Sequence, residues 1–337
     1  MDKIFYLYLF LFGTLFGSFG SVLVYRLKSQ EKGILAGRSH CSKCGHNLGI
    51  FELIPIFSWL KNMGKCRYCK QKVSKIYPIL EISTGLVFMF VGIFLINFEK
   101  ILFLDVWEIG KLIFWLIISF ITILYIFYDI LFTEIHEGIM LVGIVTAFLG
   151  IILNNFGEIN NLIINTKNLS TNEFFISLLL GLSILGVFYI IMLKGLKEIY
   201  DFLILFIIFI SLYLYKIYFP ETNLSENTIL SGIIGALGIF IFFFLQIVFS
   251  GGRALGGGDL RIGIMIGLIL GMKFSIIGIF LGYFVGSIVG IFILIKNKRI
   301  KKGTEIPFGP FLGIGFFITI FFYQSLLEFT RNHFPFL

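Results

Sequence analysis

Four cysteines at regular spacing are the residues of this sequence most suited to specific chemistry. They form two pairs, Cys41 with Cys44 and Cys66 with Cys69, and they are the only cysteines in the 337 residues. Two Cys-x-x-Cys pairs separated by about 20 residues are typical of zinc sites in which four thiolates complete a tetrahedral shell. The pattern predicts a structural zinc site in a loop whose apolar core is too small to fold without the metal.

Two disulfide bonds are the alternative interpretation of the same cysteines. Disulfides would require an oxidising compartment, whereas the basic residues around the pairs place this loop on the reducing side of a membrane. His40 and His46 lie beside the first pair and could each replace a ligand. Because four thiolates already fill a tetrahedral site, we expect the cysteines, and neither histidine, to bind zinc.

Two aspartates, Asp129 and Asp259, could do a different chemistry. Asp129 follows the apolar run 124–128, and Asp259 follows the glycines at 256–258. A carboxylate beside a membrane span is costly, so it is expected to be functional or neutralised by a partner. If two such carboxylates meet, they share one proton, and the pair can activate water and protonate a carbonyl oxygen, as in aspartic proteases.

Each aspartate also has a purely structural interpretation. Asp129 could cap the end of a helix, and Asp259 could begin a helix at its positive N-terminus, with Arg261 as a nearby partner. The spacing of residues alone does not choose between these roles and catalysis.

The elements that must position these residues are apolar helices. Only 14% of the residues are charged and 58% are hydrophobic, whereas a soluble domain carries charge on about a quarter of its positions. The sequence predicts an all-α, polytopic bundle of about eight to ten membrane-spanning helices with a small zinc-binding cytoplasmic loop domain. The candidate spans lie near residues 4–25, 78–98, 109–130, 138–153, 173–193, 200–219, 229–249, 260–272, 273–295 and 307–328. The segment 260–272 is too short to cross alone and is expected to pack inside the bundle.

The distribution of Lys and Arg predicts the orientation of these spans. Basic residues gather between positions 28 and 75 and again between 296 and 302, whereas the loops at 99–108, 154–172 and 221–227 are acidic or rich in Asn. Positive loops stay in the cytoplasm, so both chain ends are expected outside, with the cysteine loop and both aspartates toward the cytoplasm. The net charge of +8 is therefore explained by orientation in a lipid bilayer, which is the expected partner. No binding of nucleic acid is predicted.

The order of these features resembles that of the type IV prepilin peptidases. Residues 17–19 (Gly-Ser-Phe) and 25–27 (Tyr-Arg-Leu) are similar to the first-helix signature of that family, although Ser21 stands where Asn is usual. The cysteine loop is similar in the stretches around both cysteine pairs, at 54–55, 58–60, 64–67 and 77–81. The resemblance divides the chain into a first transmembrane helix at 1–27, a cysteine loop at 28–77 and a peptidase bundle at 78–337.

Three further motifs carry the resemblance into the bundle. Asp129 precedes 135–137 (Ile-His-Glu), where the family has Ile-Pro-Asp or a variant. The family motif Gly-x-Gly-Asp-x-Lys is matched by 256–261, with Arg261 in place of Lys. The closing turn 306–310 (Ile-Pro-Phe-Gly-Pro) is also similar. The spans at 173–219 resemble a hairpin inserted between the catalytic motifs, and an even number of crossings keeps both aspartates on one side.

The resemblance implies two activities in a bacterial inner membrane. The first is cleavage of type IV prepilins or pseudopilins after the glycine that ends the leader, with Asp129 and Asp259 as the catalytic pair. The second is N-methylation of the new N-terminal phenylalanine by S-adenosylmethionine, which the presence of the cysteine loop favours. Glu81 is a candidate to orient an ammonium group, although it could also be a structural acid at a helix end.

Other protein classes explain fewer of these features. A presenilin-like or signal-peptide-peptidase-like protease also has two intramembrane aspartates, but that group lacks the cysteine loop and has Pro-Ala-Leu where this chain has 307–310 (Pro-Phe-Gly-Pro). A proton-coupled transporter would explain the membrane acids but not the cysteines, and the sequence has no visible inverted repeat. A noncatalytic scaffold would use the zinc loop alone.

Overall fold

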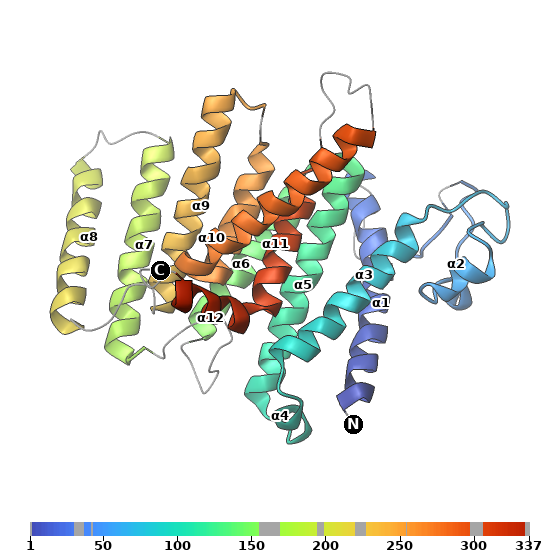
Figure 1. The fold of residues 1–337 in the computed structure, drawn as a ribbon, viewed down its shortest axis with the longest axis horizontal. Helices are drawn as coiled ribbons and strands as arrows, with labels where there is room; N and C mark the ends of the chain where they lie inside the picture. The colour runs from blue at the N-terminus through green and yellow to red at the C-terminus, as the bar shows by residue number, and fades with distance from the viewer. Residues whose placement is uncertain are drawn as a thin grey trace. The chain divides into compact units, whose positions relative to one another are not determined.

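Helices make up nearly all of the chain that the structure describes (Figure 1). In the computed structural model these residues are 2–29, 37–41, 43–154, 169–193, 199–219, 227–253, 255–296 and 306–333. Within these ranges, extended pairing is limited to two isolated bridges, and no strand forms. The expected all-α class is therefore confirmed.

Five helices in the described ranges are long and apolar enough to cross a membrane, and a bent pair makes a sixth. Several apolar helices of this kind make the chain a multi-pass membrane protein. Three shorter apolar helices occupy further predicted spans. The helices are α1 (Asp2–Ser29), α2 (Phe57–Lys61), α3 (Ile76–Leu95), α4 (Phe98–Leu102), α5 (Val106–Phe132), α6 (Glu137–Leu153), α7 (Thr171–Leu193), α8 (Ile199–Tyr218), α9 (Thr228–Ser250), α10 (Gly257–Lys296), α11 (Gly309–Phe321) and α12 (Tyr323–His333), with a 3-10 helix at Ile50–Glu52.

The chain forms two compact units. The first contains Met1–Gly143 with Ile300–Gly313, and the second contains Ile144–Arg299 with Ile314–Leu337. The first unit therefore holds the cysteine loop and Asp129, and the second holds Asp259. The division into regions 1–27, 28–77 and 78–337 stays a prediction, as does the interpretation of 173–219 as an insertion.

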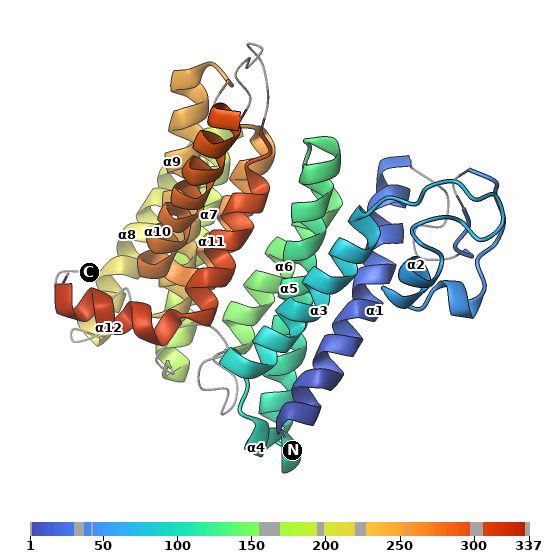
Figure 2. The same cartoon turned by 45° about the vertical axis from the view of Figure 1, so that its right-hand side comes forward.

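In the first unit, α1 and α3 run side by side because glycines remove the side chains between them (Figure 2). A Cβ at Gly13 would lie 2.7 Å from the carbonyl oxygen of Thr84, and one at Gly17 would lie 2.6 Å from Cα of Glu81. From α3, a Cβ at Gly85 would lie 2.9 Å from the carbonyl oxygen of Phe10. Small residues spaced four apart allow this close approach in membranes, where van der Waals packing drives helix association.

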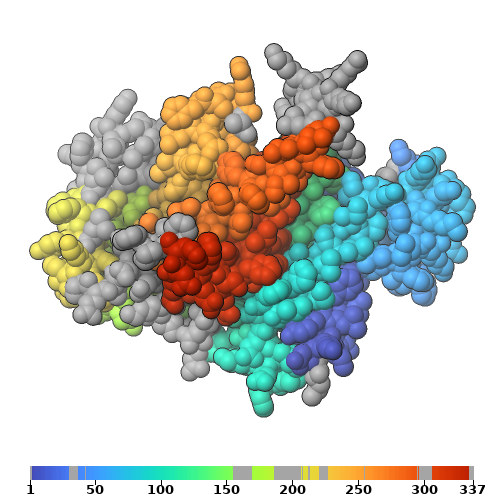
Figure 3. Space-filling model, viewed as in Figure 1, coloured from blue at the N-terminus to red at the C-terminus, as the bar shows by residue number. Residues whose placement is uncertain are grey.

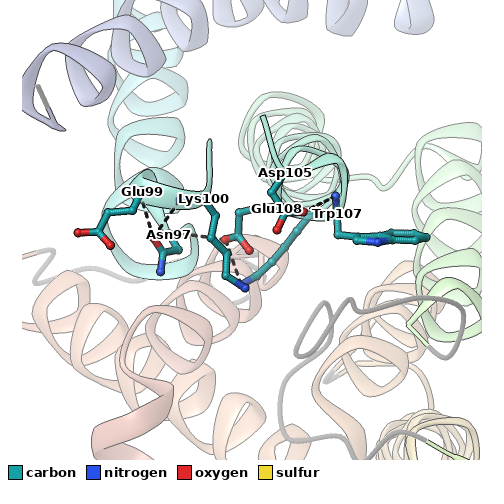
Figure 4. Close-up of polar contacts among 7 residues, drawn as sticks. Asn97, Glu99, Lys100, Asp105, Trp107 and Glu108 are labelled. Atoms are coloured by element: carbon teal, nitrogen blue, oxygen red, sulfur yellow. Dashed lines mark hydrogen bonds and ion pairs between the residues drawn. The ribbon is translucent and has the colours of Figure 1, made fainter. Parts of the chain in front are cut away.

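A buried carboxylate joins the end of α3 to the start of α5 in the same unit (Figure 4). Glu108 accepts a hydrogen bond from the backbone N–H of Asn97 at 2.7 Å and lies 3.5 Å from Nζ of Lys111. Asn97 caps α4 and Asp105 caps α5 with their side-chain oxygens. The predicted loop at 99–108 is therefore a short helix between two caps, which satisfies the backbone donors at both helix starts.

In the second unit, α9 and α10 also pack closely through small residues. A Cβ at Gly267 would lie 2.4 Å from Cα of Ala236, and one at Gly235 would lie 2.7 Å from the carbonyl carbon of Gly271. Gly271 interrupts α10 with φ 69° and ψ −176°, and the backbone N–H of Met272 bonds to Oγ of Ser231 at 3.0 Å. The predicted boundary between 260–272 and 273–295 therefore corresponds to a real break in the helix.

The short first half of α10 packs inside its unit, as the sequence predicts. Ile262, Met265, Ile266 and Ile269 are fully buried. A segment of this length cannot cross a bilayer alone, and burial against α9 replaces lipid contact along this half.

The span predicted at 307–328 is bent. Its first helix, α11, ends at Phe321, and α12 turns away from α11 by 83°. The change of direction coincides with a change in composition, because Gln324, Ser325 and Glu328 follow an almost wholly apolar helix. Polar side chains in an apolar span would be costly, so the bend lies where the polar residues begin.

Helices α7 and α8 form a hairpin, and α7 packs on α9 (Figure 1). Leu180, Tyr215 and Leu230 form its apolar contact, and the side chain of Asn227 donates to Oγ of Ser177 at 2.6 Å. Three predicted loop features, the 155–168 and 220–226 segments and the basic residues at 298–302, lie outside the described residues.

Replacing Gly271 by Ala should destabilise the fold by about 1–3 kcal/mol, because its backbone conformation is open essentially to glycine alone. The added Cβ would also meet Oγ of Ser231 at 2.6 Å. Gly290→Ala in the same helix is the matched control, since its Cβ would meet nothing within 4 Å. The measurement is thermal unfolding in detergent followed by circular dichroism, and equal midpoints for the two variants would contradict the argument.

Candidate functional site

The four cysteines lie on two turns that have the same pattern of backbone hydrogen bonds. His40 pairs with Asn47 and Lys65 pairs with Lys72 as isolated antiparallel bridges, so each pair of cysteines sits in a loop of the same length. In both turns the residue after the second cysteine, Gly45 or Lys70, has a positive φ. The backbone of each turn is closed by a hydrogen bond from Cys41 N–H to the His46 carbonyl or from Cys66 N–H to the Gln71 carbonyl.

This arrangement brings all four thiols together. Their Sγ atoms lie within 4.8 Å of one another, and Sγ of Cys41 is 3.9 Å from Sγ of Cys69. A tetrahedral zinc ion with Zn–S bonds of about 2.3 Å requires sulfur atoms about 3.8 Å apart. All four cysteines are free thiols, so the predicted cluster is present and its geometry fits a metal ion better than two disulfides.

The protonation of the cluster is uneven. Backbone N–H groups of Cys44 and Lys43 lower the pKa of the Cys41 thiol to about 6. At Cys69 the backbone N–H of Gln71 lowers the pKa, but burial and the three other thiols outweigh it and raise the pKa to about 11. Bringing four thiolates together therefore requires a cation among them.

The cysteine segment has little apolar core of its own. In the space-filling view its side chains form a compact lobe beside the start of α3 (Figure 3). Trp59 packs against Gly64 and donates its indole N–H to the Val73 carbonyl at 3.3 Å, whereas Ile50, Phe51 and Met63 are more than three-quarters exposed. A segment so poorly packed depends on its turns and its metal-binding cluster for order.

Asp129 lies in the last turn of α5 and is only 5% exposed. Its Oδ2 accepts a hydrogen bond from the backbone N–H of Gly309, the first residue of α11, at 2.8 Å. Its backbone carbonyl accepts the N–H of Thr133, which ends α5 in a left-handed conformation. The carboxylate therefore faces the positive N-terminus of a second helix, an arrangement that favours negative charge.

Asp259 lies in the first turn of α10 and is 7% exposed. Its Oδ2 accepts the backbone N–H of Gly256 at 3.0 Å, and its own N–H bonds to the Gly256 carbonyl at 3.2 Å. The glycine-rich turn thus wraps around the carboxylate, and a Cβ at Gly257 would meet nothing within 4 Å. Asp259 serves as a helix-start residue, but it pairs with no cationic side chain in the described part of the chain, so Arg261 does not neutralise it.

The two aspartates belong to different units, so each is described by its own surroundings. Their pairing stays a prediction, together with their catalytic roles. The four cysteines, by contrast, are brought together within the first unit.

The departures from the motif after Asp129 have local explanations. His136 stands before α6 and its Nδ1 accepts the N–H of Gly138 at 3.1 Å, so it caps the helix. Glu134 is exposed and pairs with Lys28 at 2.6 Å, and Glu137 is also exposed, at the start of α6. Both glutamates lie beyond the end of α5, as the sequence predicts.

The sequence motifs do not reveal three contacts of the buried acids. The N–H of Gly309 holds Asp129, and the Ser18 hydroxyl and the N–H of Ile56 hold the Glu81 carboxylate, the latter at 2.7 Å. The motif at 306–310 can be recognised in the sequence. The hydrogen bond from the N–H of Gly309 to Asp129, 180 residues away, cannot.

Comparison with known proteins tests the N-terminal part of the chain directly. Residues 11–95, from α1 through the cysteine segment to the end of α3, match the Bacterial Peptidase A24 N-terminal domain. Within these residues the chain is similar to prepilin leader peptidase/N-methyltransferases of several bacteria. The resemblance stated from the motifs is therefore confirmed, whereas Asp129 and Asp259 both lie outside the matched residues.

Similar A24 relatives come from diverse bacteria and carry the name prepilin leader peptidase/N-methyltransferase. The chain is 40% identical over 85 residues to that of Myxococcus xanthus, 40% over 85 residues to that of Bacillus subtilis and 31% over 128 residues to that of Vibrio cholerae. These matches cover 25%, 25% and 29% of this chain, and 25%, 34% and 51% of the relatives. The chain thus spans between a quarter and about half of their length. No solved structure matches it.

Proposed function

We propose that this chain is a membrane-embedded aspartyl endopeptidase that removes the leader from type IV prepilins or pseudopilins, cutting after the glycine that ends the leader. The observation that carries the proposal is the match of residues 11–95 to the A24 N-terminal domain, with relatives named for prepilin processing. The four-cysteine loop within the match separates this proposal from a presenilin-like protease, and the membrane acids alone would suit a transporter equally well.

In the proposed reaction, Asp129 and Asp259 share one proton between their carboxyl groups. The ionised member takes a proton from water as the water attacks the scissile carbonyl, while the protonated member donates to the carbonyl oxygen. The intermediate then collapses, the C–N bond breaks and the leaving amine is protonated. The two products are the leader peptide and a mature chain with a free amino terminus.

The surroundings of each carboxylate support these roles. Both are buried, and one oxygen of each is held by a glycine N–H at the start of a helix. A carboxylate fixed through one oxygen by the backbone keeps a defined orientation. Such a group can still gain and lose a proton during turnover.

We also infer a second activity, N-methylation of the new terminal phenylalanine by S-adenosylmethionine. The names of the relatives and the cysteine-containing domain that they share with this chain support it. Glu81 is the residue proposed to orient an ammonium group, because its carboxylate is 7% exposed and lies in the matched domain.

The metal proposed for the cysteine cluster is a structural zinc ion. Cys41, Cys44, Cys66 and Cys69 supply four thiolates at compatible distances, which leaves no coordination position for water. The ion would stabilise the fold of the segment and take no part in the reaction. The proposed location is the bacterial inner membrane, with this segment and both aspartates toward the cytoplasm.

Asp129→Asn and Asp259→Asn should each lower the rate of leader cleavage by at least about a hundredfold, because both protonation states are needed in one turnover. The measurement is cleavage of a prepilin-like peptide by purified protein in detergent. Glu134→Gln and Glu137→Gln are the controls and should change the rate little, since both side chains lie beyond the end of α5. Full activity in either aspartate variant would refute the assignment, and an absence of any defined cut would favour the transporter alternative.

Purified protein should contain about one zinc ion per chain, and changing Cys41 and Cys44 together to Ser should remove it. His40→Ala with His46→Ala should retain the metal, because neither ring belongs to the four-thiol cluster. Metal content can be measured by mass spectrometry after gel filtration. A cysteine segment that stays folded and metal-free in the wild type would contradict the proposal.

The two activities should be separable, because methyl transfer needs a donor and an amine but no pair of carboxyl groups. Asp259→Asn should still methylate a precleaved peptide that begins with phenylalanine. Cys66→Ser should reduce methylation at least as much as cleavage, since Cys66 is the most buried ligand of the cluster. Methylation by both variants can be measured as transfer of the methyl group from labelled S-adenosylmethionine. Loss of methylation in Asp259→Asn, but not in Cys66→Ser, would show that the two activities share a site.

A further inference from the structure

A cavity of about 520 Å³ lies in the first unit between α1, the start of α3 and the cysteine segment. Ser18 and Tyr25 of α1, Tyr77 and Glu81 of α3, and Trp59 and Cys66 of the cysteine segment contribute to its wall. Its volume is within the range of small-molecule sites. Because all its walls belong to one unit, the cavity is a feature of the A24 N-terminal domain itself.

Glu81 is the acidic group that α3 contributes to the wall of this cavity. Its Oε2 accepts the N–H of Ile56 at 2.7 Å and its carboxylate also bonds to the Ser18 hydroxyl. The contact of Gly17 with Cα of Glu81 holds this part of α3 against α1. Among the described residues no cationic side chain pairs with Glu81, so a 7% exposed carboxylate faces the cavity with only neutral donors. A cationic ligand group would offset the cost of burying this charge.

The remaining walls are aromatic and basic. Tyr25 and Tyr77 stack with ring centroids 5.5 Å apart, and Trp59 lies on the cysteine segment in the same wall. Aromatic faces suit both a cation and a planar heterocycle. Basic side chains also line the cavity from the cysteine segment, namely Lys43, Lys65, Arg67 and Lys72. Arg26 of α1 and a second carboxylate, that of Glu52 beside Arg67, also line the cavity. The cavity therefore offers the Glu81 carboxylate from α3 and several basic side chains from the cysteine segment. This distribution fits a zwitterion with its cationic group toward α3.

We propose that this cavity binds S-adenosylmethionine, with its α-ammonium group against Glu81 and its carboxylate toward the basic side chains of the cysteine segment. The inference rests on the methyl-transfer activity proposed above and assigns that activity a site. The two charged groups of the amino-acid part thereby meet opposite charges, and the aromatic walls are available to the adenine ring.

The chemistry of methyl transfer decides which positive charge Glu81 holds. The lone pair of the neutral peptide amine forms an N–C bond with the methyl group as the C–S bond breaks. Sulfur keeps the bonding electron pair and becomes a neutral thioether, and the amine then releases a proton to solvent. A carboxylate beside sulfur would stabilise the substrate more than the transition state, whereas the α-ammonium keeps its charge throughout. Glu81 is therefore a binding residue for the ammonium end.

Binding of the reaction product, S-adenosylhomocysteine, tests this assignment without any turnover. Isothermal titration calorimetry on the full chain in detergent should show binding to the wild type. The deaminated analogue of S-adenosylhomocysteine should bind at least about tenfold more weakly, because a hydrogen bond to a charged group is lost. This comparison uses the wild type alone and so does not depend on the folding of any variant.

Glu81→Gln should weaken S-adenosylhomocysteine binding by at least about tenfold and leave binding of 5′-methylthioadenosine, which lacks the amino-acid part, nearly unchanged. Glu134→Gln is the control, because Glu134 is exposed, pairs with Lys28 at 2.6 Å and does not line the cavity. It should bind S-adenosylhomocysteine within about threefold of the wild type. Retained zinc and an unchanged thermal midpoint would show that each variant folds.

Equal affinity of wild type and Glu81→Gln for S-adenosylhomocysteine would overturn the proposal. Competitive displacement of S-adenosylhomocysteine by a peptide that begins with free phenylalanine, but not by its N-acetyl form, would assign the Glu81 contact to the acceptor amine and would also overturn it. If the ligand binds through Glu81 while no peptide is methylated, the site stands and the proposed methyltransferase activity fails. If methylation occurs without binding here, the activity stands and this site fails.

Discussion

Four buried carboxylates in the described part of this chain are held by backbone N–H groups, and the candidate sites depend on that constraint. Glu81, Glu108, Asp129 and Asp259 each accept a backbone N–H at 2.7–3.0 Å. In an apolar bundle an unsolvated carboxylate costs several kcal/mol, and donors are scarce because helices use their own. The donors come from places where helices start or loops turn, so the acids lie near helix ends. The ends of the helices are consequently where chemistry can occur.

Glycine-mediated packing fixes where those ends lie. In the first unit Gly13, Gly17 and Gly85 let α1 and α3 touch, which brings Ser18 beside Glu81. In the second unit Gly235 and Gly267 allow the same approach between α9 and α10. Larger side chains at these positions would push the helices apart, and hydrogen bonds between them would be lost. Membrane helices of low polarity can therefore place polar groups accurately through close backbone contact.

Much of the architecture could be predicted from the sequence, because lipid as a solvent leaves few choices for the backbone. The apolar runs predicted the helices, and the spacing of Cys41, Cys44, Cys66 and Cys69 predicted the cluster that the structure contains. The bend in the last span was not predicted, because an average over an apolar window hides the polar residues that follow Phe321. The donors to Asp129 and Glu81 were also missed, since backbone N–H groups leave no mark in a sequence. The pairing of Asp129 with Asp259 remains a matter of motif and chemistry.

The walls of the cavity in the A24 N-terminal domain include Cys41 and Cys66, two of the four residues that could hold the metal. Binding of a ligand in the cavity and binding of a metal by the four thiols are then thermodynamically linked if either one changes the shape of the other site. Linkage is reciprocal, so a metal that raises the affinity for a ligand by some factor is itself held more tightly by the same factor when the ligand is present. If the cluster holds the proposed zinc ion, loss of the metal would lower ligand binding in this domain before it affected the helices that carry Asp129 and Asp259. Of the two proposed activities, methyl transfer would then fall before leader cleavage.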